Sequence, residues 1–100
     1  MRREQYRLSP EAQRDLLEIE AYVEQRAPGA ADTIMDDIEA ACALIGEHPE
    51  AGRVRDEIDR EVRSFPVGSY VIFYYSQINP VGVARILHGK RDLGSAFRNP

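Results

Sequence analysis

Residues 62–92 read VRSFPVGSYVIFYYSQINPVGVARILHGKRD, and no other part of the chain has continuous strand chemistry. β-branched and aromatic residues fill this stretch, and turn-forming residues interrupt it at 66–69 and again at 77–80. The pattern predicts three strands, at residues 62–65, 70–75 and 81–87. Because both turns are short, we expect neighbouring strands to pair antiparallel as a meander.

Two amphipathic helices are predicted before this stretch. Ser9 is a favourable N-cap and proline is tolerated at the first helical position, so the first helix should cover residues 10–26. Acidic residues such as Asp15 are expected on its solvent face. A break at residues 27–29 leads to a second helix at 30–47 and predicts an antiparallel helical hairpin. The apolar stripes comprise Ala12, Leu16, Ile19 and Val23 in the first helix, and Ile34, Ile38, Ala41 and Ile45 in the second.

The order of these elements predicts the fold class. Residues 4–8 alternate polar and apolar side chains, which indicates a short strand, and the polar residues 50–60 should form a loop or an extended lead-in. The resulting order is β-α-α-β-β-β, an α+β fold in a single domain of residues 1–100. The hairpin must bury its stripes, so it should pack on one face of a small, mainly antiparallel sheet. The other face is then exposed or available to a partner.

Composition bears on the compartment of the protein. The lone cysteine, Cys42, offers no disulfide framework, fits a reducing cytoplasm and lies in an apolar helical pattern, so we expect it to be buried. No segment approaches the ~20 apolar residues that span a bilayer. The N-terminal MRREQYRL has no apolar run after its basic residues, so it is not expected to be a signal peptide. We therefore expect a cytoplasmic protein with no cofactor, no metal site and no membrane partner.

The net charge of −4 conceals an asymmetry. Residues 1–61 carry eight Arg and sixteen Asp or Glu, whereas residues 62–100 carry five basic residues and one Asp. A basic C-terminal part on an acidic chain indicates an anionic partner on that side, or attraction between the two parts of the chain.

The chain resembles the ParE branch of the RelE/ParE toxin superfamily. The resemblance rests on LSPEAQRDLLEIEAYV near the start, on the helical hairpin, on RSFPVGSYVIFYY and above all on VARILHGKRDL, so it covers nearly the whole chain. It implies a compact α+β toxin from a bacterial toxin–antitoxin operon, with a ParD-like antitoxin as its partner. ParE toxins are understood to inhibit DNA gyrase, whereas RelE toxins cleave mRNA in the ribosome, and the shared fold does not choose between these activities.

The residues for metal-independent RNA cleavage are present. His88 has the side chain for acid–base catalysis, and cations such as Arg63 and Arg85 have the chemistry to hold phosphate. Three observations oppose this reading. The chain is acidic, and Phe97 occupies the region where the RelE-type arrangement has a tyrosine. Strand alternation also places His88 on the face opposite to that of Arg85. By the same alternation, Arg85 should share its face with Val81, Val83 and Leu87, and His88 should share its face with Ile86.

These considerations favour a gyrase inhibitor that is not a hydrolytic enzyme. The alternatives are a RelE-like ribosome-dependent mRNA endonuclease, with His88, Arg63 and Arg85 as catalytic residues, and an inactive module that only binds antitoxin. No sequence-specific binding of nucleic acid is expected. The antitoxin should lie along the hairpin and then cross the sheet. The expected target-binding residues are Lys90, Arg91, Arg85 and Arg98, and the expected antitoxin-binding residues are Leu17, Tyr22, Arg63, Tyr74 and Arg85. The strand tyrosines could instead serve packing alone.

Overall fold

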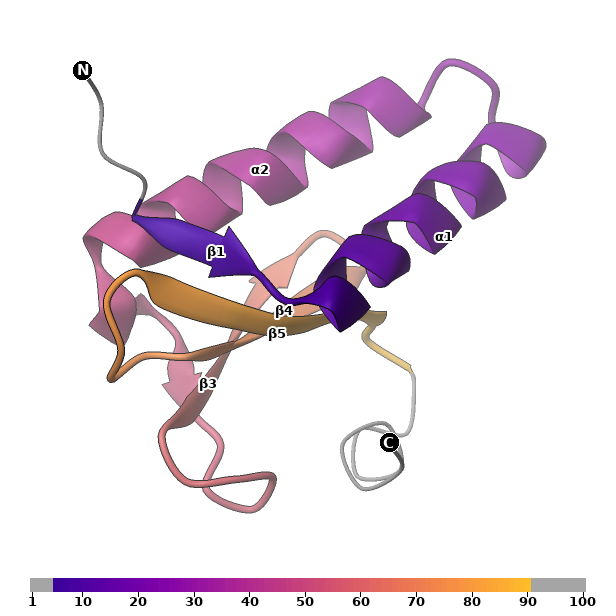
Figure 1. The fold of residues 1–100 in the computed structure, drawn as a ribbon. Helices are drawn as coiled ribbons and strands as arrows, with labels where there is room; N and C mark the ends of the chain where they lie inside the picture. Colours follow the sequence, from indigo (N-terminus) through magenta and orange to yellow (C-terminus); the bar gives the residue numbers. More distant parts are fainter. Residues whose placement is uncertain (1–4, 91–100) are drawn as a thin grey trace.

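A mixed sheet carries both helices on one of its faces in the computed structural model of the protein, which describes residues 5–90 (Figure 1). The sheet has five strands in the order β1-β5-β4-β3-β2. Strand β1 pairs parallel with β5, and all other neighbours pair antiparallel. The elements are β1 (Tyr6–Leu8), α1 (Pro10–Arg26), α2 (Ala31–Glu47), the 3₁₀ helix η1 (Pro49–Ala51), β2 (Arg53–Val54), β3 (Val62–Val67), β4 (Tyr70–Tyr75) and β5 (Val81–His88).

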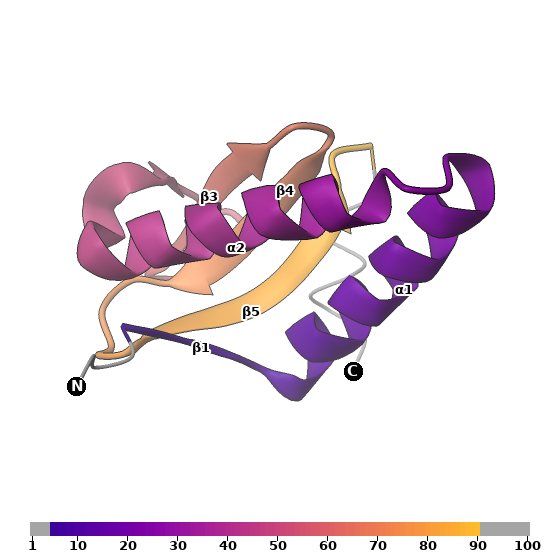
Figure 2. The ribbon, with the colours of Figure 1, turned by 90° about the horizontal axis from the view of Figure 1, so that it is seen from above.

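The α+β fold and the helical hairpin are confirmed. Helix α1 and strand β4 have the predicted bounds, and the other predicted elements are present with small shifts of their ends. Figure 2 shows both helices lying over the same side of the sheet. The segment expected to be a loop or lead-in at residues 50–60 also contributes η1 and the edge strand β2. Two residues are too few for alternation to reveal a strand, so this strand depends on its pairing with β3.

Ser9 joins the first strand to the first helix. Its hydroxyl accepts a hydrogen bond from the backbone N–H of Ala12 (2.9 Å), as an N-cap does, and donates one to the carbonyl of Ala84 (2.8 Å). Its backbone N–H donates to the carbonyl of Val83 at 2.9 Å. The residue that starts α1 therefore also ties the end of β1 to the middle of β5.

The main core lies between the helices and the sheet. It includes three residues at alternating positions of β4, Tyr70, Ile72 and Tyr74, and all are buried. The helices contribute most of their predicted stripes. Fully or largely buried helix residues in this core are Ala12, Ile19, Val23, Ala31, Ile38, Ala41, Cys42 and Ile45.

The opposite sheet face is partly covered, which corrects the expectation of an open face. A second cluster of Val62, Phe73 and Leu87 is buried there, with Ile58 packed against it. Ile58 belongs to the loop between β2 and β3, and the guanidinium of Arg55 in the same loop lies 5.7 Å from the centre of the Phe73 ring. This loop therefore covers one part of the sheet face that carries no helices.

A β-bulge in β5 changes the predicted alternation. Phe73 pairs with Arg85 and Tyr74 pairs with Val83, so Ala84 is the extra residue. Before the bulge, Val83 faces the helices. After it, the helix side is taken by Ile86, and Arg85 lies opposite Phe73 on the other face.

The prediction that Arg85 shares a face with Val81 and Val83 is therefore wrong, because the inserted residue reverses the alternation between them. The predicted separation of Ile86 from Leu87 holds, since these residues enter the two different clusters.

The hydroxyl of Tyr74 supports the segment that follows α2. It accepts a hydrogen bond from the backbone N–H of Gly52 and donates one to the carbonyl of Pro49, both at 2.8 Å. A Cβ at Gly52 would lie 2.5 Å from this hydroxyl, so the close approach requires glycine. Burial is the main cause that raises the pKa of Tyr74 above its ordinary value.

Replacing Tyr74 by Phe is expected to lower the free energy of unfolding by about 1–3 kcal/mol, because the buried N–H of Gly52 loses its acceptor. Urea denaturation measures the change. Tyr75→Phe is the matched control, since the Tyr75 hydroxyl donates to Asp59 at an exposed position, and its loss should be about 0.5 kcal/mol or less. Equal losses in the two variants would contradict the role assigned to Tyr74.

Candidate functional site

Asp15 holds helix α1 against β5 where β1 has ended. Its carboxylate is 6% exposed and accepts a hydrogen bond from the backbone N–H of Ile86 at 2.9 Å. The pairing of β1 with β5 stops at Leu8 and Val83, so this N–H lies beyond the reach of the neighbouring strand. The carboxylate thus takes the place of a strand partner at the open part of the β5 edge.

The same carboxylate forms a two-pronged ion pair with Arg85. The Nε of Arg85 donates to one oxygen at 2.8 Å and a terminal nitrogen donates to the other at 3.0 Å. The hydrogen bond that Arg85 donates to Asp15 is the main reason that the pKa of Arg85 lies above its ordinary value. Arg85 was expected to contact phosphate, a target or an antitoxin, but its guanidinium is engaged in holding α1 to the sheet.

Sequence reasoning missed Asp15 by placing it on the solvent face. The residue comes three positions after Ala12 and four before Ile19, so helical spacing puts it on the buried stripe. The sequence signal for a buried carboxylate was an acidic residue at a position of the apolar stripe. The sequence could not predict its partner, because Arg85 lies seventy residues further along the chain.

A groove of about 390 Å³ lies between α1 and the ends of β4 and β5. It brings Tyr22, His88 and Lys90 together, three residues that the sequence had marked separately. The rings of His88 and Tyr70 pack nearly perpendicular to one another with 5.5 Å between their centres, and Nδ1 of His88 accepts a hydrogen bond from the backbone N–H of Lys90 at 3.2 Å. We call this the helix groove.

The three candidate nuclease residues are not assembled. Arg63 lies opposite Tyr74 and donates to the carbonyl of Gly52 at 2.8 Å, whereas His88 lies opposite Tyr70 at the other end of β4. Four residues along a strand correspond to about 13 Å. Since Arg85 is paired with Asp15, the arrangement supplies no shared pocket for a scissile phosphate between these three side chains.

The predicted antitoxin contacts divide into exposed and internal residues. Leu17 is 67% exposed and Tyr22 is 51% exposed, with the Arg26 guanidinium 3.9 Å from the centre of the Tyr22 ring. Tyr74 is fully buried, so its side chain does not reach a partner in this fold, and Arg63 is bound to backbone carbonyls. Among the predicted target contacts, Lys90 is exposed. Arg91 and Arg98 lie outside the described residues, as does Phe97.

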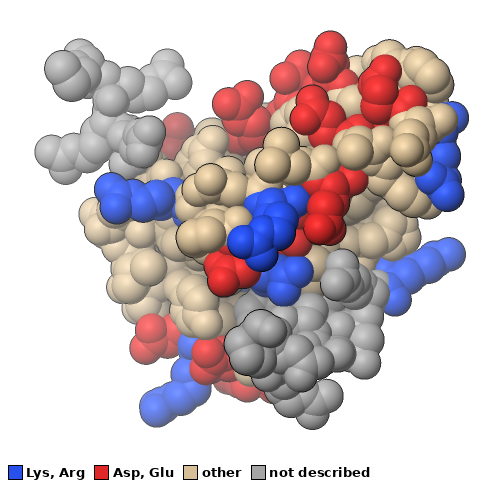
Figure 3. Space-filling view, turned by 45° about the vertical axis from the view of Figure 1, so that its right-hand side comes forward, with Lys and Arg blue, Asp and Glu red and all other residues tan. Residues whose placement is uncertain are grey.

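Charge is distributed unevenly over the surface. Residues 10–47, the hairpin, hold ten Asp or Glu and two Arg. Figure 3 shows acidic side chains gathered mainly over the upper part of the face it presents, with basic side chains at its centre and edges. A surface of this kind repels phosphates, so the hairpin is unsuited to bind nucleic acid.

Burial excludes Cys42 as a nucleophile, because desolvation raises the pKa of its thiol to about 12. Within residues 5–90, no group of three or more His, Cys, Asp and Glu side chains is placed to hold a metal ion. In the same described part of the chain, no helix has the length and apolar character that crossing a membrane requires.

The fold matches a solved structure described as the chromosomal ParDE TA system from P. aeruginosa. The TM-score is 0.72 over 84% of this chain and 94% of that one, at 16% sequence identity. At this identity the match concerns the fold alone, a helical hairpin packed on a small sheet.

Sequence comparison defines the family. Residues 6–93 match the family model described as ParE toxin of type II toxin-antitoxin system, parDE. Two relatives come from Caulobacter vibrioides. "Toxin RelE3" is 35% identical over 82 residues, which is 81% of this chain and 89% of that protein. "Toxin ParE1" is 36% identical over 85 residues, which is 83% of this chain and 86% of that protein. The chain belongs to the ParE toxin family of type II toxin–antitoxin systems, within the wider ParE/RelE group.

Asp15→Asn is expected to lower the free energy of unfolding by about 2–4 kcal/mol, because it leaves the largely buried guanidinium of Arg85 without its anion. Chemical denaturation measures the loss. Glu18→Gln removes a carboxylate from the exposed side of the same helix and should cost about 0.5 kcal/mol or less. A loss for Asp15→Asn no larger than that of the control would contradict this assignment.

The Cys42 thiol is expected to resist DTNB at pH 8 in the folded protein and to react when urea unfolds it, because the thiolate is the reactive form. The folded pKa of about 12 lies above the ordinary 9.0. The resulting stabilisation is therefore complete below pH 9.0 and is lost as pH rises toward 12. Rapid reaction of native protein would show that this part of the core is open.

Proposed function

We propose that this toxin inhibits DNA gyrase without hydrolysing a substrate, and that a ParD-like antitoxin neutralises it. The observation that carries the proposal is the separation of Arg63, Arg85 and His88, two of which are engaged in internal contacts. General acid–base catalysis needs its groups within hydrogen-bond reach of one reacting centre. An inhibitor needs only an exposed surface that fits its target.

The proposed target surface lies at the end of β5. Lys90 is an exposed cation at the mouth of the helix groove, and Arg91 and Arg98 follow it in the sequence. The proposed antitoxin surface lies on α1, where Leu17 and Tyr22 expose apolar area that a partner would bury. Both partners are expected in the cytoplasm.

A RelE-like ribosome-dependent mRNA endonuclease is the second candidate. One observation favours it: the relative named Toxin RelE3 is 35% identical to this chain. In this alternative His88, which is exposed at the end of β5, would be the acid–base residue.

The test is a gyrase supercoiling assay run beside an mRNA cleavage assay with translating ribosomes. We expect loss of supercoiling and intact mRNA. Lys90→Ala should raise the toxin concentration for half-inhibition about tenfold, because it removes an exposed cation from the target surface. Arg60→Ala, an exposed cation of the β2–β3 loop, should leave it unchanged.

Two other outcomes of these assays would contradict gyrase inhibition, and they can be told apart. Cut mRNA with unaffected gyrase would replace the proposal by the endonuclease, with His88→Ala as the next variant. Folded, soluble protein that affects neither assay would support an inactive module that only binds antitoxin.

A further inference from the structure

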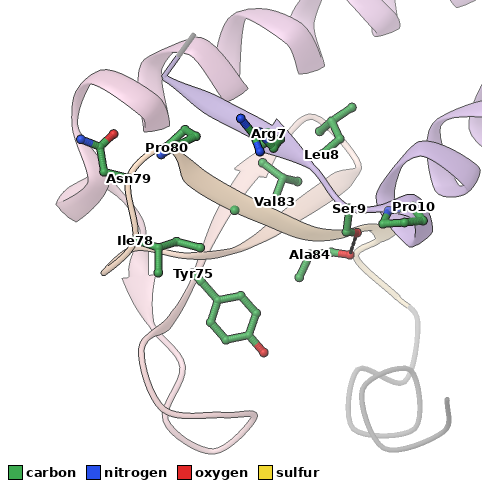
Figure 4. A pocket seen from close by; sticks show the side chains of 11 residues that line it. Arg7, Leu8, Ser9, Pro10, Tyr75, Ile78, Asn79, Pro80, Val83 and Ala84 are labelled. Carbon is green, nitrogen blue, oxygen red and sulfur yellow. Dashed lines mark hydrogen bonds between the residues drawn. The ribbon is translucent and has the colours of Figure 1, made fainter.

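The sheet face opposite the helices has a hollow beside its covered part. A groove of about 480 Å³ lies there below β1 and β5, and we call it the far-face groove. Figure 4 shows Asn79 and Pro80 at one end of it and Ser9 and Pro10 at the other, with Tyr75 and Ile78 along one side.

One row of residues across three strands creates this groove. Arg7 of β1 pairs with Gly82 of β5, and Gly82 pairs with Tyr75 of β4. Paired residues point to the same face, and Tyr75 packs with the far-face cluster, so all three lie on that face. Gly82 has no side chain. Arg7 and Tyr75 therefore lie on either side of the glycine, and the side chain of Ile78 reaches over it.

The groove combines apolar walls with a single charge. Ile78 is 54% exposed at its rim, and a Cβ at Gly82 would lie 2.9 Å from the Cδ1 of Ile78, which shows how this side chain leans over the glycine. Of the lining residues that the structure describes, Arg7 is the one with a charge. An apolar side chain would gain by burial here, and a carboxylate beside it would meet the guanidinium.

Charge complementarity favours an occupant that carries an acidic residue. The hairpin carries ten acidic residues against two basic ones, so an acidic segment of a partner is repelled there and is favoured beside Arg7. We propose that the far-face groove binds a segment of the antitoxin in which an apolar side chain, packed against Tyr75 and Ile78, lies next to an Asp or Glu that pairs with Arg7. This inference rests on the antitoxin partner of the proposed function. It adds a second contact to the one on α1.

The test measures the affinity of the purified full chain for its cognate antitoxin by titration calorimetry. Ile78→Asp and Arg7→Glu should each weaken binding at least tenfold. Gly82→Val should do the same, because its side chain would displace that of Ile78 into the groove. Valine suits a strand, and it meets the flexible end of Ile78, so this variant should remain folded. Circular dichroism and thermal unfolding check the fold of each variant.

Matched controls lie outside the groove. Arg60→Glu makes the same charge change in the exposed β2–β3 loop, and Val54→Asp makes the same kind of apolar-to-acid change at a residue 48% exposed on the edge strand. Both should keep the wild-type affinity within twofold. A charge-reversed antitoxin, with Lys in place of the matching acid, should recover affinity for Arg7→Glu.

Each of the other outcomes would contradict the inference and would indicate a different role for the groove or a different partner. Wild-type affinity in all three groove variants would remove the antitoxin from the groove while leaving the proposed function intact. Loss of gyrase inhibition with unchanged antitoxin affinity would make the groove a target surface. A concentration-dependent dimer that Ile78→Asp dissociates would assign the groove to a second copy of the chain. A wild-type chain that binds no antitoxin would overturn both the inference and the proposed partner.

Discussion

The carboxylate of Asp15 connects the two layers of this protein. It satisfies the backbone N–H of Ile86, neutralises the guanidinium of Arg85 and is itself buried on the stripe of α1. A buried carboxylate is costly unless it is both paired and hydrogen-bonded, and here both conditions are met by consecutive residues of one strand. The position of α1 along β5 is therefore defined by a polar contact. The apolar stripe alone would tolerate sliding.

That contact depends on the bulge at Ala84. The extra residue turns Arg85 out of the main core and brings Ile86 into it, so the guanidinium comes round the open edge of β5 to reach Asp15. Ser9 binds the carbonyl of the bulged residue and caps α1 with the same hydroxyl. Ser9 thus links the start of the helix, the end of β1 and the bulge. Each of these three parts supplies a hydrogen-bond partner for a polar group of another part.

The arrangement separates two sides of the toxin. Helix α1 presents exposed apolar residues among acids, and the end of β5 presents Lys90 beside the helix groove. The far face is covered by Ile58 at Phe73, and it has a groove beside Gly82, where Ile78 lies over the glycine. Under the proposed function, these faces offer separate surfaces to a target and to an antitoxin, and the antitoxin would contact more than one of them.

Local chemistry in the sequence determined the helices and the central strands. The cap at Ser9, the break at residues 27–29 and the turn residues around β4 act within a few positions, so the bounds of α1 and β4 could be predicted. Leu17 and Tyr22, which the sequence marked only as antitoxin-binding residues, are exposed on α1. Only the tertiary structure decided which partners the charged residues contact. Asp15 and Arg85 are seventy residues apart, the bulge exists only in the register between β4 and β5, and Arg7, Gly82 and Tyr75 become neighbours only when three strands pair. No local pattern encodes these contacts, because each depends on which residues lie opposite one another across the sheet.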